Sequence, residues 1–189
     1  MRDLPYAIVM GASAGALEAL SAILPAFPAD YPLPIFLVVH LPPDKTSVLA
    51  ELLQRRCHLR VIEAEDKASI HPGHVYIAPP DYHLLVENEG YLSLSGEEEV
   101  LFSRPSIDVL FESAAEAYGN RLVGVVLSGA NHDGAAGSKA IAARGGTIVV
   151  QDPERAYARA MPEAARSMCP HATTLPLDAI GPYLTGLVA

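Results

Sequence analysis

Short runs of apolar, mostly β-branched residues recur along the chain, and segments with helical periodicity separate them. Most of these runs lack polar alternation, which is typical of strands buried on both faces of a sheet. We therefore expect an α/β fold, with a doubly wound, mostly parallel sheet and helices on both of its faces. The predicted strands are residues 7–10, 35–39, 59–62, 75–77, 122–127 and 147–150, and the predicted helices are residues 17–24, 47–56, 107–118, 135–144 and 162–168.

Two runs with polar alternation, residues 83–87 and 91–95, interrupt this pattern. The loop between them contains Gly90, and a short loop with glycine is typical of a β-hairpin. We expect this hairpin to be an antiparallel excursion at the edge of the sheet. The chain has 189 residues, of which 50% are hydrophobic, so it can bury one full core, and we expect residues 1–189 to form a single domain.

The net charge, and the lack of a membrane-spanning stretch or a signal peptide, bear on the class of partner and on the location of the protein. The net charge is -9 and the 13 basic residues form no long run, which disfavours nucleic acid and anionic membrane surfaces. No stretch approaches the roughly 18 apolar residues that span a bilayer, and no signal peptide is evident. Cys57 and Cys169 lie in no metal-ligand or redox spacing. We expect a soluble cytoplasmic protein without membrane insertion, and its oligomeric state stays open.

The first predicted strand runs directly into a turn that carries Ser13 and leads into a helix. The neighbours of Ser13 are small, so the backbone can approach a ligand closely. Amide groups at the start of the helix, such as those of Ala14 and Gly15, can stabilise a developing negative charge. The position therefore suits a nucleophile with an oxyanion site, although a serine here can also simply cap the helix.

A histidine and an acid occupy the corresponding places after two other predicted strands. His40 follows one strand and Asp133 lies shortly after another. In an open parallel sheet, the ligand crevice lies outside the carboxyl ends of the strands, so we expect both residues to meet Ser13 there. The three residue types predict a triad in which His40 lies within hydrogen-bond reach of both partners. Asp133 could instead cap a helix, and the residues alone leave open His132 as the base and Asp152 as the acid.

Cofactor sites are poorly supported. His71, His74 and His83 do not complete a zinc pattern, so we expect no metal. The turn at residues 11–15 lacks the third glycine of a dinucleotide-binding fold, and His40 stands where that fold has an acid that binds ribose. We therefore expect no cofactor.

Three segments of the sequence resemble the catalytic domain of the chemotaxis protein-glutamate methylesterases, the CheB type. Residues 11–15 resemble the nucleophile motif of this family, residues 38–42 its histidine strand, and residues 127–135 its acid loop. Further matching segments cover nearly the whole chain in order, and they are residues 75–84, 104–111, 150–152 and 161–162.

The resemblance implies that Ser13 is the nucleophile, His40 the base and Asp133 the orienting acid. It also implies hydrolysis of methyl esters on glutamate side chains, with release of methanol and without a cofactor. The implied partner is the cytoplasmic domain of a methylated chemoreceptor, and some relatives also deamidate receptor glutamines.

This chain departs from the usual family pattern in two places. Residues 14–16 are Ala-Gly-Ala where the family usually has Thr-Gly-Gly, and residues 129–131 are Gly-Ala-Asn where it usually has Gly-Met-Gly. The backbone amide of Ala130 can still serve an oxyanion site, but the loss of the methionine reshapes the pocket. A catalytically weak or silent module that docks on receptors is therefore the alternative function.

The first predicted strand also begins within ten residues of Met1. This leaves no room for the amino-terminal phosphoreceiver domain that is common in the family. We expect a catalytic domain without a receiver domain.

Overall fold

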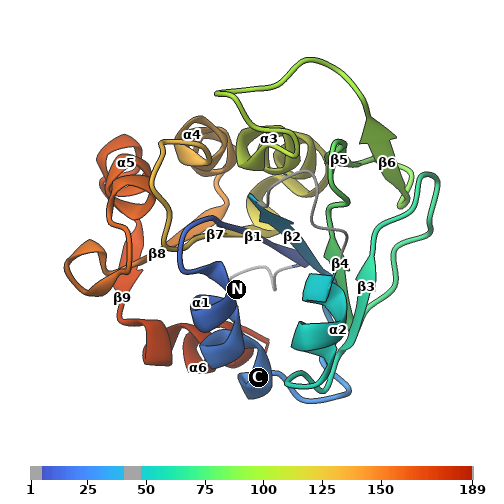
Figure 1. Ribbon diagram of the computed structural model, residues 1–189, viewed down its shortest axis with the longest axis horizontal. Coiled ribbons are helices and arrows are strands. Elements are labelled where there is room, and N and C mark those ends of the chain that lie inside the picture. Colours follow the sequence, from blue (N-terminus) through green and yellow to red (C-terminus); the bar gives the residue numbers. More distant parts are fainter. Residues whose placement is uncertain (1–5, 41–47, 189) are drawn as a thin grey trace.

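The computed structural model describes residues 6–40 and 48–188 (Figure 1). Within this part of the chain, seven parallel strands form one sheet in the order β3-β4-β2-β1-β7-β8-β9. The strand order reverses between β1 and β7, so the prediction of a doubly wound parallel sheet is confirmed. The strands are β1 (Ala7–Ala12), β2 (Ile35–Val39), β3 (Arg60–Glu63), β4 (His74–Ile77), β7 (Leu122–Val126), β8 (Thr147–Gln151) and β9 (Thr173–Leu175).

Helices cover both faces of the sheet, as Figure 1 shows. The helices on one face are α1 (Ala16–Ile23), α2 (Val48–Gln54) and α6 (Leu177–Gly186). The helices on the other face are α3 (Ile107–Tyr118), α4 (Ala135–Ala143) and α5 (Ala160–Met168). Short 3-10 helices are η1 (Leu24–Ala26), η2 (Gly119–Arg121) and η3 (Pro153–Arg155).

The central strand β1 explains why its sequence lacks polar alternation. Ile8 and Met10 point into the core beneath α1 and α6, whereas Ala7 and Val9 point into the core beneath α3. All four side chains are fully buried, and burying one large aliphatic side chain contributes about 1.5–3 kcal/mol to folding. A polar residue at any of these positions would lose its water without gaining a partner.

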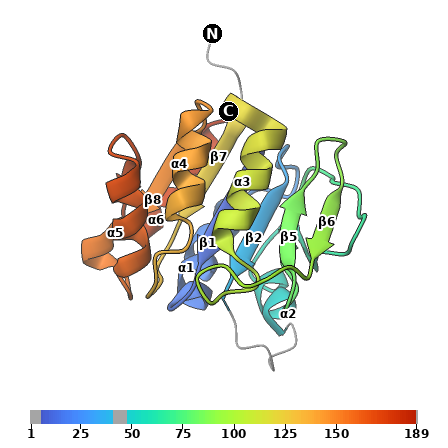
Figure 2. The same cartoon turned by 90° about the horizontal axis from the view of Figure 1, so that it is seen from above.

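The predicted hairpin forms, but it is not an extension of the sheet edge. The strands β5 (His83–Val86) and β6 (Leu92–Ser95) make a separate two-stranded antiparallel sheet beside α3 (Figure 2). Leu84 and Leu92 are fully buried in the same core as α3, and the amide of Val86 donates to Ser113 Oγ at 3.1 Å. Packing of these apolar side chains on the helix therefore takes the place of pairing with an edge strand.

Two carboxyl-terminal elements were not predicted. The strand β9 has three residues, and α6 contains Gly181 and Pro182, both of which disfavour a helix interior. The predicted helix 47–56 appears as α2, although its first residue, Ser47, lies outside the described residues.

Candidate active site

The three predicted catalytic residues follow three neighbouring strands, β1, β2 and β7. Ser13 comes directly after β1 and His40 directly after β2, while Asp133 lies in the loop between β7 and α4. The amide of His40 donates to the carbonyl of Ala12 at 3.1 Å, and the amide of Ser13 donates to the carbonyl of Ser128 at 2.9 Å. These backbone hydrogen bonds hold the carboxyl ends of the three strands together.

The turn after β1 does not use the side chain of Ser13 as a helix cap. Gly15, with a φ of +82°, occupies the N-cap position of α1, so Ser13 is not the cap of this helix. Ser13 is partly exposed, and its hydroxyl makes no hydrogen bond within the described part of the chain. Ser128 holds this turn in place, because its hydroxyl donates to the carbonyl of Ala14 at 2.7 Å and accepts from the amide of Ala158 at 2.8 Å.

His40 and Asp133 are in direct contact. The Nε2 atom of His40 lies 2.8 Å from Oδ2 of Asp133, and Asp133 is fully buried while 13% of the His40 side chain is exposed. The Asp133 carboxylate also accepts hydrogen bonds from Ser106 Oγ at 3.0 Å and from the backbone amides of Ile107, Asp108 and Gly134 at 2.7, 2.9 and 3.0 Å. Five donors therefore fix the orientation of the carboxylate that faces His40.

These donors keep Asp133 ionised. Burial by itself would raise the pKa of Asp133, but the hydrogen bonds from His40 and from the amides of Asp108 and Ile107 lower it below its ordinary value. An ionised carboxylate at this place orients the imidazole and stabilises its charged form.

Asp133 and Asp108 connect the first turns of α3 and α4. Asp133 precedes α4, but three of its donors come from the start of α3. Asp108 belongs to α3 and accepts from the amides of Gly134 and Gly137 at the start of α4, at 2.9 and 2.7 Å. Sequence reasoning singled out neither Ser106 nor Asp108 for the site, although both lie in the segment 104–111 that carried part of the family resemblance.

Asn131 is a further residue that sequence reasoning did not assign to the site. Its Nδ2 atom lies 3.3 Å from Nδ1 of His40, and its Oδ1 atom accepts from the amide of Asp133 at 3.1 Å. Both ring nitrogens of His40 therefore have a polar neighbour, and the expected hydrogen bond between His40 and Ser13 is not formed in this structure.

The three residues predicted for an oxyanion site present free amides. In the described part of the chain, the backbone N–H groups of Ala14, Gly15 and Ala130 donate no hydrogen bond. Ala14 and Gly15 follow Ser13 directly, and Ala130 lies on the loop that also carries Asp133. Unpaired amides beside a hydroxyl can bind a developing oxyanion.

The alternative catalytic residues lie in other surroundings. His132 is exposed, and Asp152 accepts from the amide of Glu154 at 3.1 Å as the cap of η3. Among the three histidines weighed as metal ligands, His83 is buried and accepts from the amide of Ser106 at 3.1 Å, and His71 and His74 lie beside each other with ring centroids 5.7 Å apart. The structure thus pairs Asp133, and not Asp152, with a histidine.

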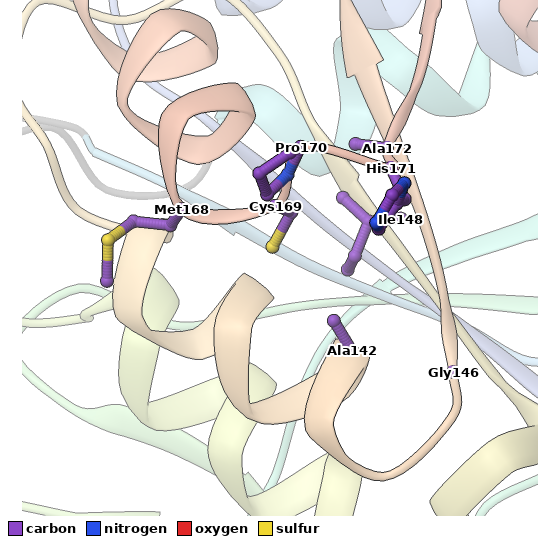
Figure 3. Close-up of a pocket in the computed structure, with 8 residues that line it drawn as sticks. All are labelled: Ala142, Gly146, Ile148, Met168, Cys169, Pro170, His171 and Ala172. Atoms are coloured by element: carbon purple, nitrogen blue, oxygen red, sulfur yellow. The ribbon is translucent and has the colours of Figure 1, made fainter.

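A cavity of about 260 Å³ lies away from these residues (Figure 3). It lies near the amino ends of β8 and β9, whereas Ser13 lies at the carboxyl end of β1. The residues that line it are mostly apolar, and they are Ala142, Gly146, Ile148, Met168, Cys169, Pro170, His171 and Ala172. Burial raises the pKa of the Cys169 thiol, which disfavours its reactive thiolate form. This cavity has no part in the site of Ser13.

Within the described residues, no helix combines the length and the apolar character needed to cross a bilayer.

Comparison with known proteins identifies the family. The family profile described as CheB methylesterase matches residues 8–184. A relative from Leptospira interrogans, named as a candidate protein-glutamate methylesterase/protein-glutamine glutaminase, is 48% identical over 159 residues, which cover 84% of this chain and 82% of the relative. A protein-glutamate methylesterase/protein-glutamine glutaminase from Caulobacter vibrioides is 40% identical over 182 residues, and the match covers 94% of this chain and 52% of the relative.

A solved structure agrees with this assignment. The crystal structure of the CheB methylesterase catalytic domain of Thermotoga maritima superposes with a TM-score of 0.93 at 34% sequence identity. The match covers 97% of this chain and 99% of that chain. The chain therefore belongs to the CheB methylesterase family.

Proposed function

We propose that Ser13, His40 and Asp133 form a catalytic triad that hydrolyses methyl esters of glutamate side chains in the cytoplasmic domain of chemoreceptors. The observation that carries this proposal is the 2.8 Å contact between His40 and the buried carboxylate of Asp133, at the strand ends where Ser13 also lies. Membership in the CheB methylesterase family supplies the class of substrate. A cytoplasmic substrate places the enzyme in the cytoplasm.

The contacts of His40 support a different role for each of its ring nitrogens. Because Asp133 holds Nε2, Nδ1 is the nitrogen that is left to take the proton of Ser13. The Ser13 oxygen attacks the ester carbonyl, and the negative charge develops on the carbonyl oxygen near the free amides of Ala14, Gly15 and Ala130. Methoxide leaves with the proton from His40, so methanol and an acyl-enzyme are formed.

A water molecule completes the cycle. His40 takes one proton from this water, whose oxygen attacks the acyl carbonyl, and that proton then returns to Ser13 as the glutamic acid side chain departs and ionises to the carboxylate by losing the water's second proton to solvent. Deamidation of glutamine follows the same steps with ammonia as the leaving group. The names of the Leptospira interrogans and Caulobacter vibrioides relatives carry this second activity, protein-glutamine glutaminase, and we propose it for this chain as well.

The test is methanol release from receptor membranes that were methylated beforehand. The wild type, Ser13→Ala and the control Ser69→Ala are compared at equal concentration; Ser69 is an exposed serine far from the three strand ends in sequence. We expect release by the wild type and the control but not by Ser13→Ala. A fluorophosphonate that labels serine nucleophiles, followed by peptide mass spectrometry, should modify Ser13.

Two results would count against the proposal. Full activity of Ser13→Ala would exclude Ser13 as the nucleophile. No release by any of the folded proteins, together with no labelling of Ser13, would favour the silent docking module instead.

A further inference from the structure

We propose that Asn131 is a positioning residue for His40: its side-chain amide keeps the Nδ1 atom of the base unprotonated until the hydroxyl of Ser13 replaces it. This inference rests on the proposed triad. Asn131 stands where the family usually has glycine, so the device would be particular to chains that carry asparagine here.

The orientation of the Asn131 amide follows from its neighbours. The backbone amide of Asp133 can only donate a hydrogen bond, and it lies 3.1 Å from one end of the Asn131 side chain. That end must therefore be the carbonyl oxygen Oδ1. The other end, which lies 3.3 Å from Nδ1 of His40, must be the NH₂ group Nδ2.

The Asn131 side chain also fixes the protonation of the His40 ring in this arrangement. The NH₂ group of Asn131 can only donate, so Nδ1 must accept with its lone pair and carries no proton. The proton of the neutral ring is then on Nε2, which donates to Oδ2 of Asp133 at 2.8 Å. Asn131 and Asp133 therefore select the same form of the base, from opposite sides of the ring.

Protonation of Nδ1 would turn this contact into a clash of donors. An N–H group on Nδ1 would face the NH₂ group of Asn131, and neither could accept a hydrogen bond from the other. Asn131 thus favours the neutral ring, which is the form that can activate Ser13. At 3.3 Å the contact lies beyond the usual range of an N–H hydrogen bond, so the Ser13 hydroxyl can displace it at little cost.

Asn131 also ties the base to the acid. It is two residues from Asp133, whose amide holds its side chain, so one short loop carries both neighbours of the His40 ring. Among the described residues, Asp133 contacts this ring directly, and Asp108 lies next to Asp133 at the start of α3. Asp133 favours the charged ring by its own charge, and Asn131 opposes it on the other side.

The experiment follows the two ring nitrogens of His40 by ¹⁵N NMR as a function of pH, in protein with labelled histidine. The variants are Asn131→Gly, Asn131→Asp and the control Asn120→Asp, which places the same charge at an exposed asparagine in η2. Asn131→Gly introduces the usual family residue, so the loop should keep its fold. The pH dependence of kcat/KM for methanol release is measured on the same proteins.

We expect Nδ1 of Asn131→Gly to take up its proton at a pH about 0.5–1 unit higher than in the wild type, since one weak hydrogen bond and one donor clash are removed. In Asn131→Asp, whose carboxylate accepts from Nδ1, the shift should be larger, about 1–2 units. The acid limb of the kcat/KM profile should move by the same amounts. Asn120→Asp should match the wild type.

Coinciding NMR titrations of the wild type and Asn131→Gly would overturn the inference. The NMR titration needs no substrate, so its outcome is separate from that of the proposed function. If the titration shifts but the wild type releases no methanol, the role of Asn131 stands and the proposed substrate is wrong.

Discussion

Asp133 and Asp108 are neighbouring buried carboxylates whose pKa values are displaced in opposite directions. Burial raises the pKa of Asp108 to about 6, and the charge of Asp133 acts in the same direction, against the hydrogen bonds from Gly137 and Gly134. The pKa of Asp133 is lowered despite its burial, because His40 and backbone amides donate to it. Asp133 therefore stays ionised at neutral pH, whereas Asp108 takes up a proton near pH 6.

Replacement of Asp108 by asparagine should weaken the pH dependence of stability. The pKa of Asp108 is higher in the folded chain than its ordinary value of 3.8, so its contribution to the free energy of unfolding is fully present below about pH 4 and is lost as the pH rises to about 6. The loss is on the order of 2–3 kcal/mol. In Asp108→Asn, one oxygen remains to accept from Gly134 and Gly137 while no charge develops.

Urea denaturation at several values between pH 4 and 7 measures this effect. The free energy of unfolding of the wild type should fall relative to that of Asp108→Asn across this range. The stabilising contribution of Asp133, whose pKa is lowered, is present above its ordinary value of 3.8 and is lost only as the pH falls below that value, so it does not interfere. Parallel curves for the two proteins would contradict the prediction.

Replacement of Asp133 by asparagine should leave weak activity. All five neighbours of the carboxylate donate hydrogen bonds, so the NH₂ group of an asparagine would face another donor in either orientation. We expect a loss of about 10³–10⁴-fold in kcat, as for the acid of other serine triads, and a loss of stability of about 3 kcal/mol. The control is Asp152→Asn, which should keep its activity; a larger loss in the control would move the acid role to Asp152.

Removal of the Ser128 hydroxyl should disturb the turn that carries Ser13. The hydroxyl accepts from the amide of Ala158 and donates to the carbonyl of Ala14, and Ser128 is 1% exposed. Ser128→Ala should lose about 1–2 kcal/mol of stability, and kcat should fall about 10–100-fold because the turn loses its support.

Ser113→Ala is the matched control for this variant. The Ser113 hydroxyl also accepts from a backbone amide, that of Val86, and donates to a carbonyl, that of Leu110, but it lies away from the site. It should lose stability without a specific loss of kcat. Equal effects of both variants on kcat, measured by methanol release, would exclude the supporting role of Ser128.

A side chain at Gly15 should be more harmful than one at Gly90. Both glycines have a left-handed backbone, with φ of +82° and +84°, so alanine costs about 1–2 kcal/mol at either position. At Gly15 the added Cβ would also lie 2.8 Å from Cβ of Tyr157, whereas at Gly90 no atom lies within 4 Å. Thermal unfolding should show a larger loss of stability for Gly15→Ala than for Gly90→Ala. Methanol release should fall for Gly15→Ala only.

Much of the fold could be predicted because the buried strands have an unambiguous composition. Runs such as Ile35–Val39 have no polar residue, and only a strand with both faces covered tolerates this. The position of the hairpin could not be predicted in the same way. Its alternation shows one apolar face, as in the Leu-Ser-Leu-Ser sequence of β6, but does not tell whether the covering element is another strand or, as found, α3.

The site was predictable to the extent that it follows from strand ends. The rule that ligands bind at the carboxyl ends of parallel strands brought His40 and Asp133 into one prediction, and the structure places them in contact. Ser106, Asp108 and Asn131 lie in ordinary loop and helix-start contexts. The hydrogen bonds of Ser106 and Asp108 to Asp133 depend on how α3 and α4 are placed against each other, and that of Asn131 to His40 depends on how the loop after β7 lies against the end of β2. A local pattern holds no such information.

The strand order has a consequence for local opening of the molecule. The strands β2, β1 and β7 lie at the centre of the sheet, and β3 and β9 are its edges. Backbone amides in a sheet centre generally exchange with solvent through global unfolding, whereas edges fray at lower free energy. Fluctuations of the edges would therefore leave Ser13 and His40 in register, and hydrogen exchange around them should be limited by the stability of the whole fold.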